Sequence, residues 1–167
     1  MGGAAALEWA GYSQGLLAVD LGVRTGLALF GEDGRLRWYR SQNFGSAARL
    51  KRAVHGLLNG VPALAAVVVE GGGPLARLWE RESTRRGLAF RQLSAEVWRA
   101  ALLYPREQRS GAQAKHRAEA LARRVIEWSQ APRPTALRHD SAEAILIGLW
   151  GVLELGWLGA LPPELRR

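Results

Sequence analysis

The chain has 167 residues, enough for one domain with a hydrophobic core, and its 48% hydrophobic and 23% charged residues are typical of a globular protein. It contains no cysteine, which excludes disulfides and thiolate metal sites, so any metal ion must be held by Asp, Glu or His. No apolar run is long enough to span a membrane, and the N-terminus lacks the regions of a signal peptide. We therefore expect a cytoplasmic protein with a weakly ordered tail over residues 1–14 and a single domain over 15–160.

The positive charge is concentrated in the middle of the chain. The net charge is +8, and residues 71–138 hold 14 Arg and Lys against 6 Glu, whereas the remainder holds 9 basic and 9 acidic residues. Such an excess suits a polyanionic partner, above all nucleic acid. The alternative is a solvated, arginine-rich surface with no partner.

The first part of the sequence predicts strands joined by short turns. The apolar run GLLAVDLG is typical of a buried strand that ends at Asp20. TGLALFG and RLRWYR follow, separated by the turn signal EDG, which favours antiparallel pairing. ALAAVVVE is fully apolar and also ends at an acid, Glu70. The predicted strands are 15–22, 25–31, 35–40, 63–70 and a short one at 88–93.

The rest of the sequence is mainly helical in its spacing. A Ser N-cap and a Gly stop bound the first predicted helix, and apolar residues recur at helical spacing in the later ones. GGGP (71–74) and PREQRSG (105–111) are predicted loops, and APRPT (131–135) is a predicted linker. The predicted helices are 46–60, 75–87, 94–104, 112–130 and about 139–157. This order of elements predicts an α/β fold with a mixed sheet.

Four acids fall at positions that this topology can bring together. Asp20 and Glu70 each end an apolar strand, and Asp140 and Glu143 stand three residues apart at the start of a very apolar helix. If the two strands are adjacent and parallel, their ends lie about 5 Å apart. Clustered carboxylates form a hard-oxygen site for Mg²⁺ or Mn²⁺, and two such ions can clamp a reacting phosphodiester. Taken singly, each acid is explained as well by turn chemistry, solvation or helix capping.

The segments AVDLGVRTGLALFG, VVVEGGG and RHDSAEAILIGLWG resemble the RuvC-like branch of the ribonuclease H-like superfamily. The resemblance covers about residues 15–157 and rests on the Asp-x-Gly and Thr-Gly setting of Asp20, on Glu70, and on the pair Asp140 and Glu143. It implies a ribonuclease H-like fold, with a five-stranded mixed sheet flanked by helices. It also implies an Mg²⁺-dependent endonuclease, with Mn²⁺ able to substitute, that resolves four-way DNA junctions as a homodimer.

The resemblance also suggests roles for basic residues. Lys115 falls where the family uses a lysine at the scissile phosphate, and His139 borders the last motif and could contact metal or phosphate. Trp98-Arg99 stands where relatives often carry Trp-Lys, and Glu143 where they usually carry Asp. Together with Asp20, Glu70, Asp140 and Glu143 as metal ligands, Lys115 completes the expected catalytic set. The residues expected to contact the nucleic-acid backbone are Arg77, Arg81, Arg85, Arg86, Arg91, Arg99, Arg109 and Arg117.

Other interpretations remain open at this point. A YqgF-like relative would cut RNA with the same fold, and a non-catalytic module would only bind nucleic acid. The first motif also resembles a phosphate loop of sugar kinases and actin-like ATPases, but that fold needs two such domains. Trp79, among several arginines, is a candidate for base stacking, although a core position is the more common role of tryptophan.

Overall fold

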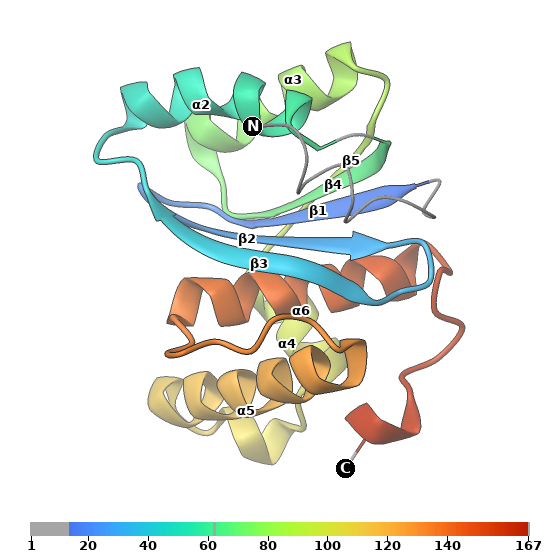
Figure 1. Cartoon of the computed structure of the whole chain (residues 1–167). Helices are drawn as coiled ribbons and strands as arrows, with labels where there is room; N and C mark the ends of the chain where they lie inside the picture. The colour runs from blue at the N-terminus through green and yellow to red at the C-terminus, as the bar shows by residue number, and fades with distance from the viewer. Residues whose placement is uncertain (1–13, 62, 167) are drawn as a thin grey trace.

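The computed structural model describes residues 14–61 and 63–166, and it is built on one five-stranded sheet (Figure 1). The strands lie in the order β3-β2-β1-β4-β5. The β1–β2 and β2–β3 pairs are antiparallel, whereas β4 is parallel to both β1 and β5, so the sheet is mixed as predicted. The strands are β1 (Gly15–Asp20), β2 (Arg24–Gly31), β3 (Leu36–Asn43), β4 (Leu64–Glu70) and β5 (Ala89–Leu93).

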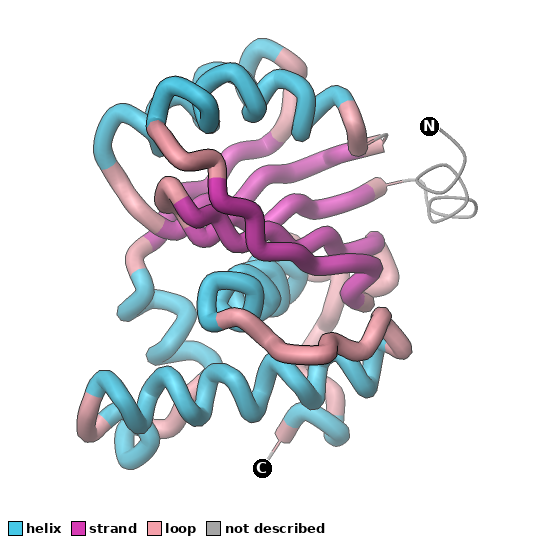
Figure 2. Tube along the Cα trace, turned by 60° about the vertical axis from the view of Figure 1, so that its left-hand side comes forward, coloured by secondary structure: helices cyan, strands magenta, loops and turns pink. Residues whose placement is uncertain are grey.

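Helices cover both faces of this sheet (Figures 1 and 2). One face carries α2 (Ala47–Asn59) and α3 (Gly73–Arg85). The other carries α6 (His139–Glu154), with α4 (Ala95–Leu102) and α5 (Gly111–Ser129) packed beyond it. Short 3₁₀ turns lie at Pro105–Gln108 and Pro163–Leu165.

The alternation of side chains along β1 explains why two cores form. Leu17 and Val19 point to the core under α2 and α3, whereas Leu16 and Ala18 point to the core under α6. Asp20 follows the second set by two residues, so its side chain lies on the α6 face. The alternation of side chains along β1 therefore places Asp20 on the face that α6 covers.

Helix α6 packs unusually close to the sheet because it presents glycine to it. A Cβ on Gly148 would lie 2.2 Å from the Phe30 ring, and a Cβ on Gly151 would lie 2.9 Å from the Leu16 side chain. These two glycines lower the helix propensity of the segment, but they let its backbone approach β1 and β2. Close packing of α6 fixes the height of its first turn above the sheet.

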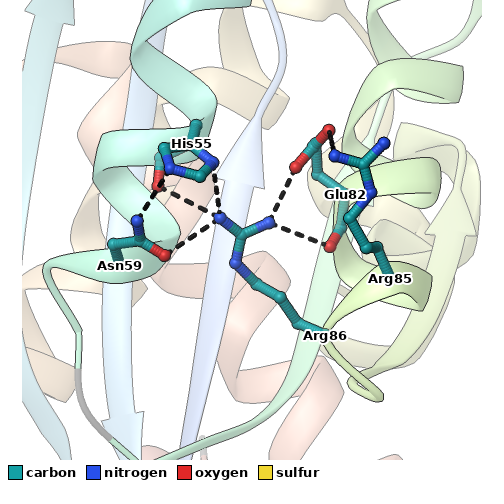
Figure 3. Close-up of polar contacts among 5 residues, drawn as sticks. All are labelled: His55, Asn59, Glu82, Arg85 and Arg86. Carbon is teal, nitrogen blue, oxygen red and sulfur yellow. Dashed lines mark hydrogen bonds and ion pairs between the residues drawn. The ribbon is translucent and has the colours of Figure 1, made fainter.

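A polar network joins the C-terminal ends of α2 and α3 (Figure 3). The Arg86 guanidinium donates to Glu82 at 2.7 Å, to the Asn59 amide oxygen at 3.0 Å and contacts His55 Nδ1 at 2.8 Å. Arg85 adds a longer ion pair to Glu82, 3.5 Å. Since this network lies at the ends of the helices remote from Gly73 and Ala47, it fixes how the two helices lie against each other.

Some element boundaries differ from the sequence-based prediction. Helix α3 begins at Gly73, inside the predicted GGGP loop, because Pro74 is well suited to a first helical turn. The predicted loop 105–111 contains a 3₁₀ turn. Helix α6 ends at Glu154, with Leu155 as its C-cap, and not near residue 157 as predicted. The predicted tail over residues 1–14 lies almost wholly outside the described residues.

Among the described residues, no helix combines the length and apolar character that crossing a membrane requires.

Candidate metal and nuclease site

The site begins as a row of residues that crosses the sheet in register. Asp20 pairs with Glu70 on one side and with Gly26 on the other, and Gly26 in turn pairs with Ser41. Residues paired in this way point to the same face, so Ser41, Gly26, Asp20 and Glu70 all face α6. The condition under which the two strand-end acids meet is fulfilled, because β1 and β4 are adjacent and parallel, with Asp20 and Glu70 paired at their carboxyl ends.

Hydrogen bonds of nearby residues hold the turn after Asp20 in place. The buried Thr25 hydroxyl donates to the Gly22 carbonyl at 2.6 Å, and the Leu21 amide donates to the Glu70 carbonyl at 3.0 Å. The first bond closes the turn between β1 and β2, and the second holds the ends of β1 and β4 together. They give a structural reason for the Asp-x-Gly and Thr-Gly pattern seen in the sequence.

Gly26 lets the first turn of α6 reach this row. A Cβ at Gly26 would lie 2.0 Å from the Asp140 carbonyl oxygen, so only glycine permits the approach. Three residues further along α6, the Glu143 side chain is buried, with 7% of its surface exposed. The helix therefore places a carboxylate beside those of Asp20 and Glu70 at the ends of β1 and β4.

Three of the four predicted acids form a compact cluster. One carboxylate oxygen from each of Asp20, Glu70 and Glu143 lies within 4.8 Å of the others. Asp140 is not part of this group. Its Oδ2 accepts a short hydrogen bond from the Ser41 hydroxyl on β3, so the side chain is directed along the row toward β3 rather than to the centre of the cluster.

Trp98 on α4 fixes Glu70. Its indole Nε1 donates to Glu70 Oε2 at 2.6 Å, and its ring is fully buried. Sequence reasoning had considered Trp98 only as a neighbour of a basic residue. The contact spans 28 residues, so no local pattern signals it.

Two cationic or potentially cationic side chains converge on one oxygen of Glu143. Arg99 Nη2 lies 3.1 Å from Glu143 Oε1, and His139 Nε2 lies 3.1 Å from the same atom. The Arg99 guanidinium also lies across the Trp98 ring, 5.2 Å from its centroid. Both Arg99 and His139, which the sequence marked as candidates, thus lie at the acid cluster.

Burial and mutual repulsion perturb the acids. Burial raises the pKa of Asp20 to about 8, with further increases from the charges of Glu143, Glu70 and Asp140 and a partial offset from Arg99. Burial also raises the pKa of Glu70, and the Trp98 hydrogen bond opposes that rise. Carboxylates held together against their own repulsion are a common feature of ligand sets for cations.

The donor set fits a small divalent cation. All three groups are carboxylates, whose hard oxygens suit Mg²⁺ and Mn²⁺, and the chain has no cysteine that would favour a softer metal. A divalent ion between Asp20, Glu70 and Glu143 would offset both the burial and the mutual repulsion that raise the pKa of Asp20.

None of the remaining predicted residues is a described hydrogen-bond or ion-pair partner of the three clustered acids. Lys115 is exposed on the second turn of α5. Arg86 is only 19% exposed and bonded to Glu82 (Figure 3). The exposed arginines of the predicted set are Arg77, Arg81, Arg85, Arg91, Arg109 and Arg117.

Two hollows lie at the edge of the sheet that carries the acids. A pocket beside Glu70 is lined by the segments that follow β4 and β5, residues 70–72 and 92–95. A groove between α2 and α3 is lined by Lys51, Arg77 and Arg81 together with apolar residues of both helices near their first turns.

The hypothesis that Trp79 stacks on nucleic-acid bases is wrong, because its side chain is fully buried in the core under α3.

Comparison with solved structures identifies the fold. The chain resembles T. thermophilus RuvC in complex with a Holliday junction substrate, with a TM-score of 0.58 and 17% identity over 86% of this chain and 96% of that chain. The sequence matches no protein-family model and no curated protein. The fold is therefore the RuvC-type, ribonuclease H-like α/β fold that the sequence predicted.

Proposed function

We propose that this chain is a divalent-metal-dependent endonuclease that cuts DNA, with the four-way junction as its substrate. The observation that carries the proposal is the cluster of Asp20, Glu70 and Glu143 at the carboxyl edge of a sheet with the RuvC-type fold. The structural neighbour was solved with a Holliday junction, which supports branched DNA over other phosphodiesters. The basic middle of the chain suits the same partner.

Asp20, Glu70 and Glu143 would hold the metal, which we propose is Mg²⁺, replaceable by Mn²⁺. When bound, the ion supplies Lewis-acid polarisation of a phosphoryl oxygen and lowers the pKa of water. We propose that Asp140, tied to Ser41, adds negative charge to the site from its margin.

The surrounding side chains hold the carboxylates in place. Trp98 orients the Glu70 carboxylate by its hydrogen bond, while Arg99 and His139 contact Glu143 Oε1. Because these contacts exist before substrate arrives, the ligand set is preorganised. We propose that Lys115, exposed and flexible on α5, moves to the scissile phosphate only when DNA is bound.

The two hollows suggest how a strand would lie. The pocket beside Glu70 leaves room next to the acids for the scissile nucleotide. The α2–α3 groove begins at the same edge of the sheet, since α2 follows the end of β3 and α3 follows Glu70. Lys51, Arg77 and Arg81 would bind phosphates there, with the exposed arginines of the predicted set as further backbone contacts. Such contacts position DNA without reading its sequence.

Resolution of a junction requires two coordinated cuts, so we propose that the chain acts as a homodimer with one site per protomer. Sedimentation of the protein alone and with a junction would test this. A 1:1 complex of monomer and junction would contradict it.

The proposal is tested by cleavage of a labelled four-way DNA junction beside linear duplex, an RNA–DNA hybrid and structured RNA, each with Mg²⁺ or Mn²⁺. We expect paired, symmetric nicks in the junction with wild type and none with Asp20→Asn. Cleavage of RNA alone would move the assignment to a YqgF-like nuclease. Tight junction binding without cleavage of any substrate would identify a non-catalytic binding module.

A further inference from the structure

The acid cluster contains a cation of its own. Arg99 is ion-paired with Glu143 at 3.1 Å, and its charge also acts on Asp20 and Glu70. The guanidinium is 27% exposed and lies against the Trp98 ring, so α4 determines where it can reach. An arginine this close to three carboxylates occupies space and oxygen atoms that metal ions would otherwise use.

Most of the acids have one oxygen already engaged. Arg99 and His139 share Glu143 Oε1, Trp98 occupies Glu70 Oε2, and Ser41 occupies Asp140 Oδ2. An ion bound to Glu143 Oε1 would lie about 2.1 Å from it, beside the Arg99 guanidinium, which has no free lone pair and would repel the ion by its charge. The His139 imidazole is no such obstacle, because its nitrogen is a common metal ligand. Arg99 therefore closes its own side of Glu143 to an ion.

The charges agree with this geometry. When Asp20 gives up its proton to a bound ion, three clustered carboxylates and one guanidinium leave two negative charges, which a single divalent ion balances. A second divalent ion would add positive charge beside a fixed arginine. The acid that could draw it, Asp140, lies outside the cluster and is held by Ser41.

We propose that each chain binds one divalent ion in the absence of nucleic acid, and that the Arg99 guanidinium occupies the place of a second ion. The inference rests on the proposed metal site. It assigns Arg99 a positioning role at Glu143, in place of the phosphate contact that the sequence suggested. Removal of its charge should open the site to a second ion.

The test is a count of bound Mn²⁺ by equilibrium dialysis, with electron paramagnetic resonance to detect coupling between neighbouring ions. We expect one ion per wild-type chain, and two magnetically coupled ions in Arg99→Ala and Arg99→Gln. Arg99→Lys, which keeps the charge, should bind one. Arg123→Ala removes a surface arginine that pairs with Glu119 on α5 and should also bind one. Thermal melts would show whether each variant is folded. If Arg99→Ala does not fold, the ion count of Arg99→Gln tests the inference.

The outcomes separate this inference from the proposed function. Two ions in the wild type, or one in the wild type and in both neutral variants, would overturn the role of Arg99 while leaving a metal-dependent nuclease intact. No ion in the wild type would overturn both. The ion count does not depend on whether any substrate is cut, so a failure to find the right DNA does not affect it.

Discussion

Among the described acids, Asp20 has a strongly raised pKa, and this makes its charge easy to test. Burial and the neighbouring acids raise its pKa from 3.8 to about 8 in the metal-free protein. A carboxyl group that binds its proton more tightly when folded destabilises the fold as it ionises. Its contribution to stability is therefore full below about pH 4 and is lost as the pH rises toward 8.

We predict that Asp20→Asn removes this pH dependence. The free energy of unfolding of the metal-free variant should exceed that of wild type increasingly between pH 5 and pH 8, by on the order of 1 kcal/mol per pH unit. Urea denaturation at several pH values, with chelator present, measures it. Added Mn²⁺ should stabilise wild type and not the variant, and a difference that stays constant with pH would contradict the shifted pKa.

The Trp98 hydrogen bond offers a second test with an internal control. Trp98→Phe keeps an aromatic ring in the core but leaves Glu70 without its donor, so the pKa of Glu70 should rise further and Mn²⁺ affinity should fall about tenfold. Trp79→Phe is the matched change, because that indole is also buried and its Nε1 has no hydrogen-bond partner among the described residues. Equal effects of the two variants in calorimetric Mn²⁺ titrations would show that the bond to Glu70 is unimportant.

The sequence indicated which acids form the cluster, but it did not indicate all of the residues that contact them. Asp20, Glu70 and Glu143 could be found because each lies at the end of an apolar element. The spacing of Asp140 and Glu143 suggested a shared role, yet the two side chains meet different elements, Ser41 on β3 and Arg99 on α4. Such contacts join residues far apart in the chain and have no local signature.

Among the elements, α6 depends on one glycine of β2 for its position. Gly26→Ala would place a methyl group 2.0 Å from the Asp140 carbonyl oxygen, which is backbone and cannot turn away. We predict destabilisation of about 2 kcal/mol or more, since overpacking of this kind forces the helix away from the sheet. Mn²⁺ affinity should fall as well, because Glu143 moves with α6.

Gly56→Ala is the control for this prediction. Gly56 lies within α2, and a Cβ there would meet nothing within 4 Å. Alanine should stabilise that helix by about 0.5–1 kcal/mol without changing metal affinity. If chemical denaturation gave Gly26→Ala the same small stabilising effect, the close approach of α6 to β2 would be refuted.

The strands were easier to predict than the ends of the helices. Apolar runs closed by Asp20 and Glu70 leave little choice for β1 and β4, and the turn signal EDG fixed the hairpin of β2 and β3. Helix boundaries depend on a few terminal residues. Gly73 and Pro74 suggested a loop by composition, but proline fits a first helical turn as well, and the tertiary position of α3 decided between them.

The whole molecule has its excess positive charge in one stretch of sequence, and the fold spreads that stretch over α3, α4 and α5 on both faces of the sheet. Only part of it lies near the acid edge. Arg77 and Arg81 line the α2–α3 groove with Lys51, whereas Arg86 and Arg99 are bonded within the protein. Net charge alone could therefore not identify the surface that we propose binds nucleic acid.

We predict that Arg77→Ala and Arg81→Ala each weaken junction binding and reduce the slope of log affinity against log salt by about 0.9, the value for one lost phosphate contact. Anisotropy titrations at several salt concentrations measure both quantities. Arg123→Ala has the same charge change on α5, away from the groove, and should leave the slope unchanged. If it reduced the slope as much as the groove variants, binding would reflect net charge and not a defined track.

We propose that cleavage of DNA by this chain requires a metal ion held by Asp20, Glu70 and Glu143. The most direct measurement is the rate of strand cleavage in a four-way junction as a function of Mn²⁺ concentration, for wild type and Asp20→Asn at equal junction occupancy. We expect a rate that saturates with Mn²⁺ for wild type, and no cleavage by the variant although it binds the junction. Cleavage that persists in the variant, or that does not depend on a divalent ion, would contradict it.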